Sequence, residues 1–185
     1  MKQIIRIIGG QYRGKKIPFL NSEGLRPTPD RVRETVFNWL MHDIRNARCL
    51  DAFAGSGAMG FEAFSRGASE VCLIEQIPTV FANLQSVILE FNSPHLTAIN
   101  GDAVGFIRNT KLSFDIIFLD PPFKSNLLLT CLNEISQSTV LNPGGLVYIE
   151  SSGDIDVPQS AWETLKHKKA GQVFYGLVKG RLVIN

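Results

Sequence analysis

The hydrophobic pattern of the chain changes about a quarter of the way along it. In the first part, an apolar run at residues 4–8 is followed by glycines and by a second run over residues 12–18, which predicts a small β-hairpin. A helix follows, because apolar residues recur at helical spacing from Val32 to Ile44. Thr28 is predicted as the N-cap of this helix and Pro29 as its first residue.

In the second part, strand-like and helix-like patterns alternate. Short apolar runs predict strands at residues 49–53, 71–75, 97–101, 114–120 and 146–151, and helical patterns lie between them at residues 58–66, 78–91, 103–109 and 126–138. Alternation of this kind is typical of a parallel sheet with helices on both faces. Two last runs, at residues 172–176 and 180–185, have only a short connection and predict an antiparallel hairpin. We therefore predict a doubly wound α/β domain over residues 29–185, preceded by a hairpin-and-loop extension over residues 1–28.

The composition is that of an ordinary globular protein. The chain has 185 residues, of which 44% are hydrophobic and 19% charged. No apolar run approaches the length that crosses a bilayer, and the N-terminus lacks the apolar segment of a signal peptide. Cys49, Cys72 and Cys131 lie in apolar stretches without a C-x-x-C pair, so we expect buried free thiols and no metal site. These features fit a cytoplasmic protein without membrane contact.

The charge is distributed unevenly along the chain. Residues 1–48 hold ten Lys/Arg and four Asp/Glu, whereas residues 49–185 hold nine Lys/Arg and thirteen Asp/Glu. A basic segment attached to an acidic body suggests that the N-terminal part binds a polyanion. A solvated basic face without a partner explains the same charge, so composition leaves both interpretations open.

A glycine-rich loop follows the first strand of the second part. Residues 49–60, CLDAFAGSGAMG, contain Gly55, Gly57 and Gly60 in the G-x-G-x-x-G spacing of nucleotide-binding loops. Glycines in such a loop let the backbone turn sharply and approach a ligand closely. A tight turn that only packs the following helix would show the same spacing.

Four carboxylates come at the ends of consecutive predicted strands: Asp51, Glu75, Asp102 and Asp120. Ligands of open α/β sheets bind at the carboxyl ends of the strands, so these side chains should line one crevice. Anionic side chains beside the glycine loop oppose a pyrophosphate and favour a ligand with an ammonium group, hydroxyls and a base amine. S-adenosylmethionine has these groups, and Glu75 can accept from both ribose hydroxyls while Asp102 accepts from the adenine amine. Taken singly, each acid is better explained as a solvated strand end or a helix cap, but four in register along one sheet edge favour the crevice.

The turn after the most apolar predicted strand has an unusual composition. Residues 114–123, FDIIFLDPPF, end in Asp120, Pro121, Pro122 and Phe123. Two prolines fix the backbone and remove two N–H donors, so the turn presents only acceptors, the Asp120 side chain and the Pro121 carbonyl. Acceptors beside an aromatic ring suit a planar base with an exocyclic amine, which they can orient toward a methyl donor. The alternative to a base-binding site is a purely structural role, as a rigid loop after a core strand.

These segments together resemble a known family. The D-P-P-F turn is similar to the [D/N/S]-P-P-[Y/F/W] motif of class I amino-methyltransferases. Over nearly the whole chain, the stretches IIGGQYRGKKI, LRPTPDRVRETVFNWL and LDAFAGSGAMGFEAFSRGA resemble the RsmD family of bacterial 16S rRNA guanine-N2 methyltransferases. The resemblance implies a Rossmann-like class I methyltransferase sheet of seven strands with an antiparallel last strand. It further implies binding to 16S rRNA or to a small-subunit assembly particle, and we expect a monomer.

The resemblance also implies three sets of site residues. The cofactor set for S-adenosylmethionine is Asp51, Phe53, Gly55, Gly57, Glu75, Gln76, Asp102 and Ala103, with the Ala103 backbone near the adenine. The set that holds the target guanine is Asp120, Pro121, Pro122 and Phe123. The set that faces rRNA phosphates is Arg6, Arg13, Lys15, Lys16, Arg26, Thr28, Arg31 and Arg33.

The expected reaction is direct methyl transfer to a base taken out of its stack. Phe123 stacks on the guanine, while Asp120 and the Pro121 carbonyl orient its amine; no nucleophile on the protein is required. Three alternatives remain at this point: a DNA adenine-N6 methyltransferase, a nicotinamide-dependent oxidoreductase, and a non-catalytic RNA-binding or assembly module. The absence of a target-recognition domain disfavours the first, Asp51 beside the loop disfavours the second, and the intact Asp120 turn disfavours the third.

Overall fold

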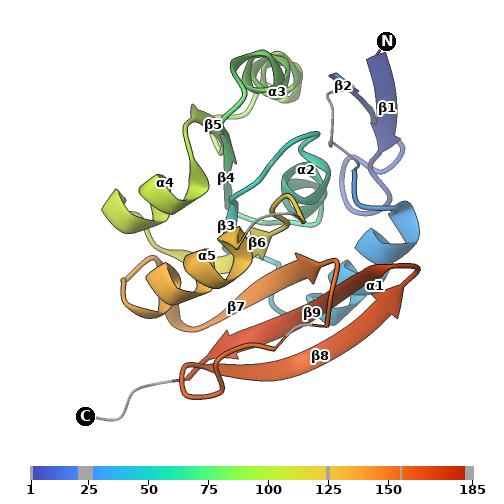
Figure 1. Cartoon of the computed structure of the whole chain (residues 1–185). Coiled ribbons are helices and arrows are strands. Elements are labelled where there is room, and N and C mark those ends of the chain that lie inside the picture. The colour runs from blue at the N-terminus through green and yellow to red at the C-terminus, as the bar shows by residue number, and fades with distance from the viewer. Residues whose placement is uncertain (1, 21–26, 124–125, 155, 182–185) are drawn as a thin grey trace.

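The computed structural model describes residues 2–20, 27–123, 126–154 and 156–181 (Figure 1). The strands are β1 (Lys2–Arg6), β2 (Lys16–Leu20), β3 (Arg48–Asp51), β4 (Glu70–Glu75), β5 (Leu96–Asn100), β6 (Phe114–Leu119), β7 (Leu141–Ser151), β8 (Trp162–Ala170) and β9 (Val173–Gly180). The helices are α1 (Asp30–Trp39), α2 (Ala58–Ser65), α3 (Pro78–Phe91), α4 (Ala103–Asn109) and α5 (Leu127–Ser136). Outside the two hairpins and α1, these bounds agree with the predicted ones within two residues, except that β7 begins at Leu141.

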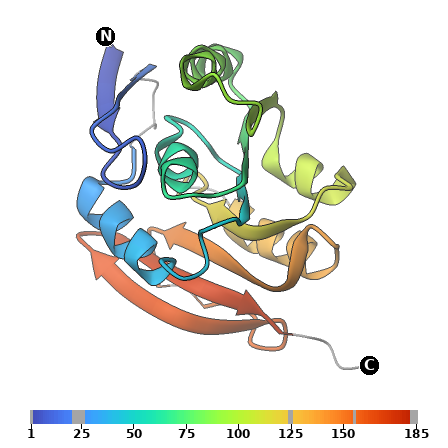
Figure 2. The same cartoon turned by 180° about the vertical axis from the view of Figure 1, so that it is seen from behind.

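Seven strands form one sheet in the order β5-β4-β3-β6-β7-β9-β8. The neighbours from β5 to β7 pair in parallel, and β9 is antiparallel to both β7 and β8. Helices cover both faces (Figure 2): α1, α2 and α3 pack into one hydrophobic cluster and α4 and α5 into another. The predicted doubly wound α/β fold with an antiparallel last strand is therefore confirmed.

The C-terminal hairpin lies earlier in the chain than the sequence pattern predicts. Its strands are β8 and β9, so the predicted pairing of residues 172–176 with 180–185 is wrong, and residues 182–185 lie outside the described part. β8 is an edge strand whose residues from Glu163 to Lys169 are all exposed. Such a strand lacks the alternation of apolar and polar residues by which a half-buried strand is recognised.

The N-terminal hairpin is present, with strands shifted by a few residues from the predicted ones. β1 and β2 pair antiparallel, and Ile5, Ile17 and Phe19 on them are buried in the same cluster as α1, α2 and α3. β2 lies against α3, where the Asn83 amide donates a hydrogen bond to the Pro18 carbonyl at 3.0 Å. The division of the chain at residue 28 stays a prediction.

Helix α1 begins one residue later than expected. Pro29 occupies its N-cap position and no side chain caps it, so the prediction of Thr28 as the N-cap is wrong. The Thr28 hydroxyl lies instead at the end of β7, where it donates a hydrogen bond to Glu150. Val32 and Phe37 face the core, as the helical spacing predicts. Among the described residues, no helix combines the length and the apolar character needed to cross a membrane.

Candidate functional site

A large cavity opens at the carboxyl edge of the sheet, with a volume of about 710 Å³. At this edge Asp51 of β3 pairs with Leu73 of β4 on one side and with Phe118 of β6 on the other. Phe118 pairs in turn with Tyr148 of β7. Since paired residues point to the same face of a sheet and the side-chain period is two, residues two positions further on project to that face as well. The carboxylates that line the cavity are accordingly Asp51, Glu75, Asp120 and Glu150.

The glycine loop between β3 and α2 makes the sharp turn that its sequence predicts. Gly55 and Gly57 have φ values of +50° and +77°, in the left-handed region that favours glycine. Gly55 lines the cavity. Gly57 does not line it; a Cβ on Gly57 would lie 2.2 Å from the Phe61 ring, so its small size serves the packing of α2.

Asp51, at the end of β3, is buried beneath the glycine loop. Its Oδ2 accepts a hydrogen bond from the Gly60 N–H at 3.0 Å. Burial, reinforced by the nearby Glu75 carboxylate, raises the pKa of Asp51 to about 7, although backbone hydrogen bonds partly oppose this. Near neutral pH, Asp51 is therefore poised between its neutral and ionised forms.

Glu75, at the end of β4, organises the backbone of the loop. Its Oε2 accepts from the Gly55 N–H at 3.0 Å and its Oε1 from the Ile77 N–H at 2.7 Å. Each carboxylate oxygen has a second lone pair, so both remain able to accept a hydrogen bond from a ligand. Phe53, Gln76 and Ala103 also line the cavity.

Asp102 is placed differently from the other predicted acids. It is exposed, it caps helix α4 by accepting from the Gly105 N–H at 2.7 Å, and it does not line the cavity. Its neighbours Gly101 and Ala103 do line the cavity. The structure thus shows Asp102 in the helix-cap role, between two residues that line the cavity.

The turn after β6 forms one wall of the cavity. Asp120, Pro121, Pro122 and Phe123 all line it, and Phe123 is 46% exposed. Burial first, then the carboxylates of Glu150 and Asp51, raise the pKa of Asp120 well above its usual range. The predicted target set is therefore gathered at one place, with a ring open to the cavity.

Glu150 is a cavity residue that the sequence reasoning missed. It is 4% exposed, and its Oε1 accepts hydrogen bonds from the Tyr148 hydroxyl at 2.6 Å and from the Thr28 hydroxyl at 3.2 Å. Burial raises the pKa of Glu150, although both hydroxyls oppose the shift. The signal was available, because Glu150 ends a predicted strand as Asp51, Glu75 and Asp120 do.

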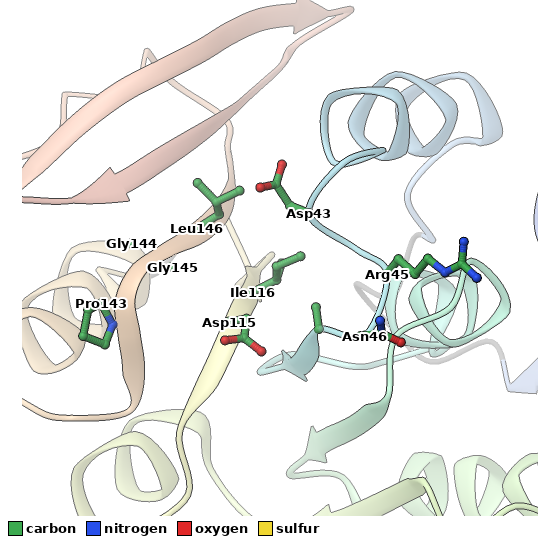
Figure 3. Close-up of a pocket in the computed structure, with 10 residues that line it drawn as sticks. Asp43, Arg45, Asn46, Asp115, Ile116, Pro143, Gly144, Gly145 and Leu146 are labelled. Atoms are coloured by element: carbon green, nitrogen blue, oxygen red, sulfur yellow. The ribbon is translucent and has the colours of Figure 1, made fainter.

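A second and smaller cavity, of about 300 Å³, lies at the opposite, amino edge of the sheet. Figure 3 shows Asp43 and Asp115 at this cavity, with the Arg45 side chain extending away from both. Asp115 accepts hydrogen bonds from the Arg48 N–H and from the Asn142 amide, each at 2.8 Å. Its oxygens thus secure the starts of β3 and β7.

The predicted phosphate-binding residues divide into surface and interior positions. Arg6, Arg13, Lys16 and Arg31 are exposed, and Lys15 forms an ion pair with Glu90 at 3.1 Å. Arg33 is 1% exposed, so its assignment as an RNA contact is wrong. Thr28 is likewise buried, at the cavity wall, and is not on the expected surface. Arg26 lies outside the described residues.

Arg33 belongs to a buried ion-pair junction centred on Glu62 of α2, which is 0% exposed. Glu62 Oε2 accepts from Arg33 Nη1 at 3.3 Å, and its Oε1 accepts from Arg66 Nε at 2.7 Å. The N–H groups of Ile8 and Gly9 also donate to Glu62, both at 2.9 Å. This carboxylate fastens the N-terminal hairpin and α1 to α2.

Comparison with known proteins yields close matches along nearly the whole chain. The family model described as conserved hypothetical protein 95 matches residues 5–179. Ribosomal RNA small subunit methyltransferase D of Haemophilus influenzae is 44% identical over 179 residues, covering 94% of this chain and 92% of that protein. The protein of the same name from Escherichia coli K12 is 43% identical over 175 residues, covering 94% and 88%. The solved structure of yhhF from Escherichia coli has a TM-score of 0.88 at 42% identity and covers 97% of this chain and 99% of that one.

Proposed function

Because the chain belongs to the RsmD family, which the conserved hypothetical protein 95 model describes, we propose that it methylates the exocyclic N2 amine of one guanine in 16S rRNA. The methyl donor in this proposal is S-adenosylmethionine. The observation that carries the proposal is the Asp120–Phe123 turn, which presents acceptors and an aromatic ring to a cavity lined by four carboxylates. The relatives named as small-subunit rRNA methyltransferases support the substrate class.

The residues at the ends of β3 and β4 fit the donor. S-adenosylmethionine, when bound, supplies a methyl group attached to a positively charged sulfur. Asp51 and Glu75 have no cationic partner among the described residues, so their negative charge is available to an ammonium, a sulfonium or hydroxyl donors. We assign Phe53, Gly55, Gln76 and Ala103 to the same site because they line it. Gly57 and Asp102 act indirectly, by shaping the loop and by holding the start of α4.

The turn after β6 orients the target amine. The Asp120 carboxylate and the Pro121 carbonyl accept the two N2 hydrogens, and Phe123 stacks on the extruded base. Holding the amine in this way directs its lone pair toward the methyl group and excludes competing orientations. In the transfer, N2 would take the methyl group that the donor supplies while the electron pair of the S–CH3 bond stays on sulfur, and the surplus proton on N2 would pass to Asp120. The raised pKa of Asp120 makes this carboxylate a better proton acceptor than an ordinary aspartate.

The basic surface supplies contacts to the RNA backbone. Arg6, Arg13 and Lys16 on the hairpin and Arg31 on α1 are exposed, and phosphate contacts from such residues position a protein without selecting sequence. Pro29, which precedes Arg31 by two residues, lines the cavity, so the start of α1 connects this basic surface to the site.

A methyl-transfer assay tests the proposal. The protein is incubated with tritiated S-adenosylmethionine and small-subunit particles that lack the modification, and the labelled base is then mapped. We expect a single labelled guanine carrying the methyl group on N2. Label on adenine in duplex DNA, or on no nucleic acid at all, would refute the proposal. Calorimetry should show binding of S-adenosylmethionine and none of a nicotinamide dinucleotide.

A further inference from the structure

Glu150 stands directly beside Asp120 at the carboxyl edge of the sheet. Leu119 of β6 pairs with Ile149 of β7 in parallel, so the next residue along each strand is Asp120 on one and Glu150 on the other. Neighbouring strands lie about 4.8 Å apart, which places the two carboxyl groups side by side on one wall. Both line the cavity, and each has a pKa raised by burial.

The described residues donate hydrogen bonds to only one of the two carboxylate oxygens of Glu150. The Tyr148 and Thr28 hydroxyls both donate to Oε1, whereas Oε2 accepts no hydrogen bond from the residues that the structure describes. Glu150 also has no cationic partner among those residues. A buried carboxyl group without a cation destabilises a fold compared with an apolar residue of similar size, so packing alone does not explain its presence.

The chemistry of base edges shows what such a group can distinguish. Guanine presents its N2 amine and its N1–H next to each other, and both are hydrogen-bond donors. Adenine and cytosine present their amine next to a ring nitrogen that carries a lone pair. An acceptor placed beside the amine-binding acceptors therefore matches guanine and faces a lone pair in the other two bases.

We propose that Glu150 accepts a hydrogen bond from N1–H of the target base, which makes the site select guanine among the bases that carry an exocyclic amine. This inference rests on the proposed function, and it assigns the choice of base to a residue outside the D-P-P-F turn. Asp120 and Pro121 hold the reacting amine, and Glu150 recognises the neighbouring ring position. Tyr148 and Thr28 fix the carboxyl group so that its remaining oxygen faces the base.

The test uses an RNA whose target base keeps the reacting amine and loses N1–H, with an amine in place of the O6 carbonyl. In 2,6-diaminopurine the N2 amine is retained while N1 carries a lone pair, so this base is placed at the mapped target position of a reconstituted particle. For the natural protein we expect kcat/KM on guanine to exceed that on diaminopurine about 100-fold, since a buried acceptor left unpaired or opposed costs about that much. In Glu150→Gln the side-chain amide can donate to the lone pair, so the preference should fall at least tenfold.

The outcomes separate this inference from the proposed function. Asp115→Asn, on the neighbouring strand β6 and at the opposite cavity, is the matched control and should leave the preference unchanged. Equal rates of the natural protein on guanine and diaminopurine would overturn the role of Glu150, whether or not its variant folds. An equal loss on both bases in Glu150→Gln would also overturn it, because a purely structural role lowers both rates alike. If the natural protein methylates no guanine, the proposed function itself fails.

Discussion

Two regions of this protein bury acidic side chains, and they do so in opposite ways. At the junction under the N-terminal hairpin, Glu62 is fully buried and receives hydrogen bonds from two arginines and two backbone N–H groups. At the carboxyl edge of the sheet, Asp51 and Glu150 are almost as deeply buried, yet they have no cationic partner among the described residues.

The difference teaches which buried charge serves the fold and which serves a ligand. A paired carboxylate stays ionised and fastens elements together, and removing either partner is costly. An unpaired one has a raised pKa and leaves its acceptor capacity open to a cation or an N–H donor. Three such groups, Asp51, Asp120 and Glu150, line one edge together with Glu75, and this edge is the candidate binding site, whereas Glu62 is a structural anchor.

The largest expected effect comes from removing the amine acceptor. Asp120→Ala should lower methyl transfer about 1,000-fold, because positioning of the amine and removal of its proton both depend on this carboxylate. Binding of S-adenosylmethionine should stay near normal, as measured by calorimetry. Asp115→Ala at the amino edge serves as the control and should lose less than tenfold. Near-normal turnover by Asp120→Ala would show that its assigned role is mistaken.

Substitution of Glu62 should change the stability of the fold rather than the rate of methyl transfer. Glu62→Gln leaves the buried Arg33 with Asp30 as its one remaining carboxylate partner among the described residues, and leaves Arg66 without its partner, so it should lower the free energy of unfolding by about 3 kcal/mol. Glu70→Gln breaks the exposed Arg48–Glu70 ion pair and should cost less than about 1 kcal/mol. Urea unfolding at pH 7 measures both changes. Equal losses in the two variants would contradict the contrast drawn between buried and exposed pairs.

Titration of Asp51 should act on stability and on binding in opposite directions. Its folded pKa of about 7 lies above the ordinary value of 3.8, so the folded state binds the extra proton. The contribution of Asp51 to stability is therefore present below pH 4 and is lost as the pH rises to about 7. Ionised Asp51 attracts a cationic ligand, so affinity for S-adenosylmethionine should rise between pH 6 and 7.5. Both slopes, from urea midpoints and calorimetry, should flatten in Asp51→Asn; an unchanged binding slope would remove Asp51 from the cofactor site.

The smallest effects should come from the basic surface. Arg31→Ala and Lys16→Ala should each reduce the slope of log affinity for RNA against log salt by about one, since each removes one phosphate contact. Lys111→Ala, exposed before β6, is the control. Arg33→Ala is unsuitable for this test because it would disturb the Glu62 junction. Unchanged slopes in both variants would place the RNA on another face.

Most residues of the candidate site could be predicted from local sequence patterns. Asp51, Glu75 and Asp120 end predicted strands, and parallel strands end at one edge, so their convergence follows from topology. Asp102 obeys the same rule and yet caps α4, because a strand-end position does not say which way a side chain turns. β8 escaped detection because an exposed edge strand has no hydrophobic period.

The sequence by itself determined the order of helices and strands as far as β7, the glycine turn and the gathering of Asp51, Glu75 and Asp120 at one edge, because these depend on residues close together in the chain. Only the tertiary structure decided that Arg33 lies inside with Glu62 and that Thr28 meets Glu150, 122 residues away. An arginine on a helix next to an apolar stripe has the same local pattern whether it faces water or a buried carboxylate. Burial and partnership are set by packing between distant segments, which is why the charges that hold the fold and those kept for a ligand separate only in three dimensions.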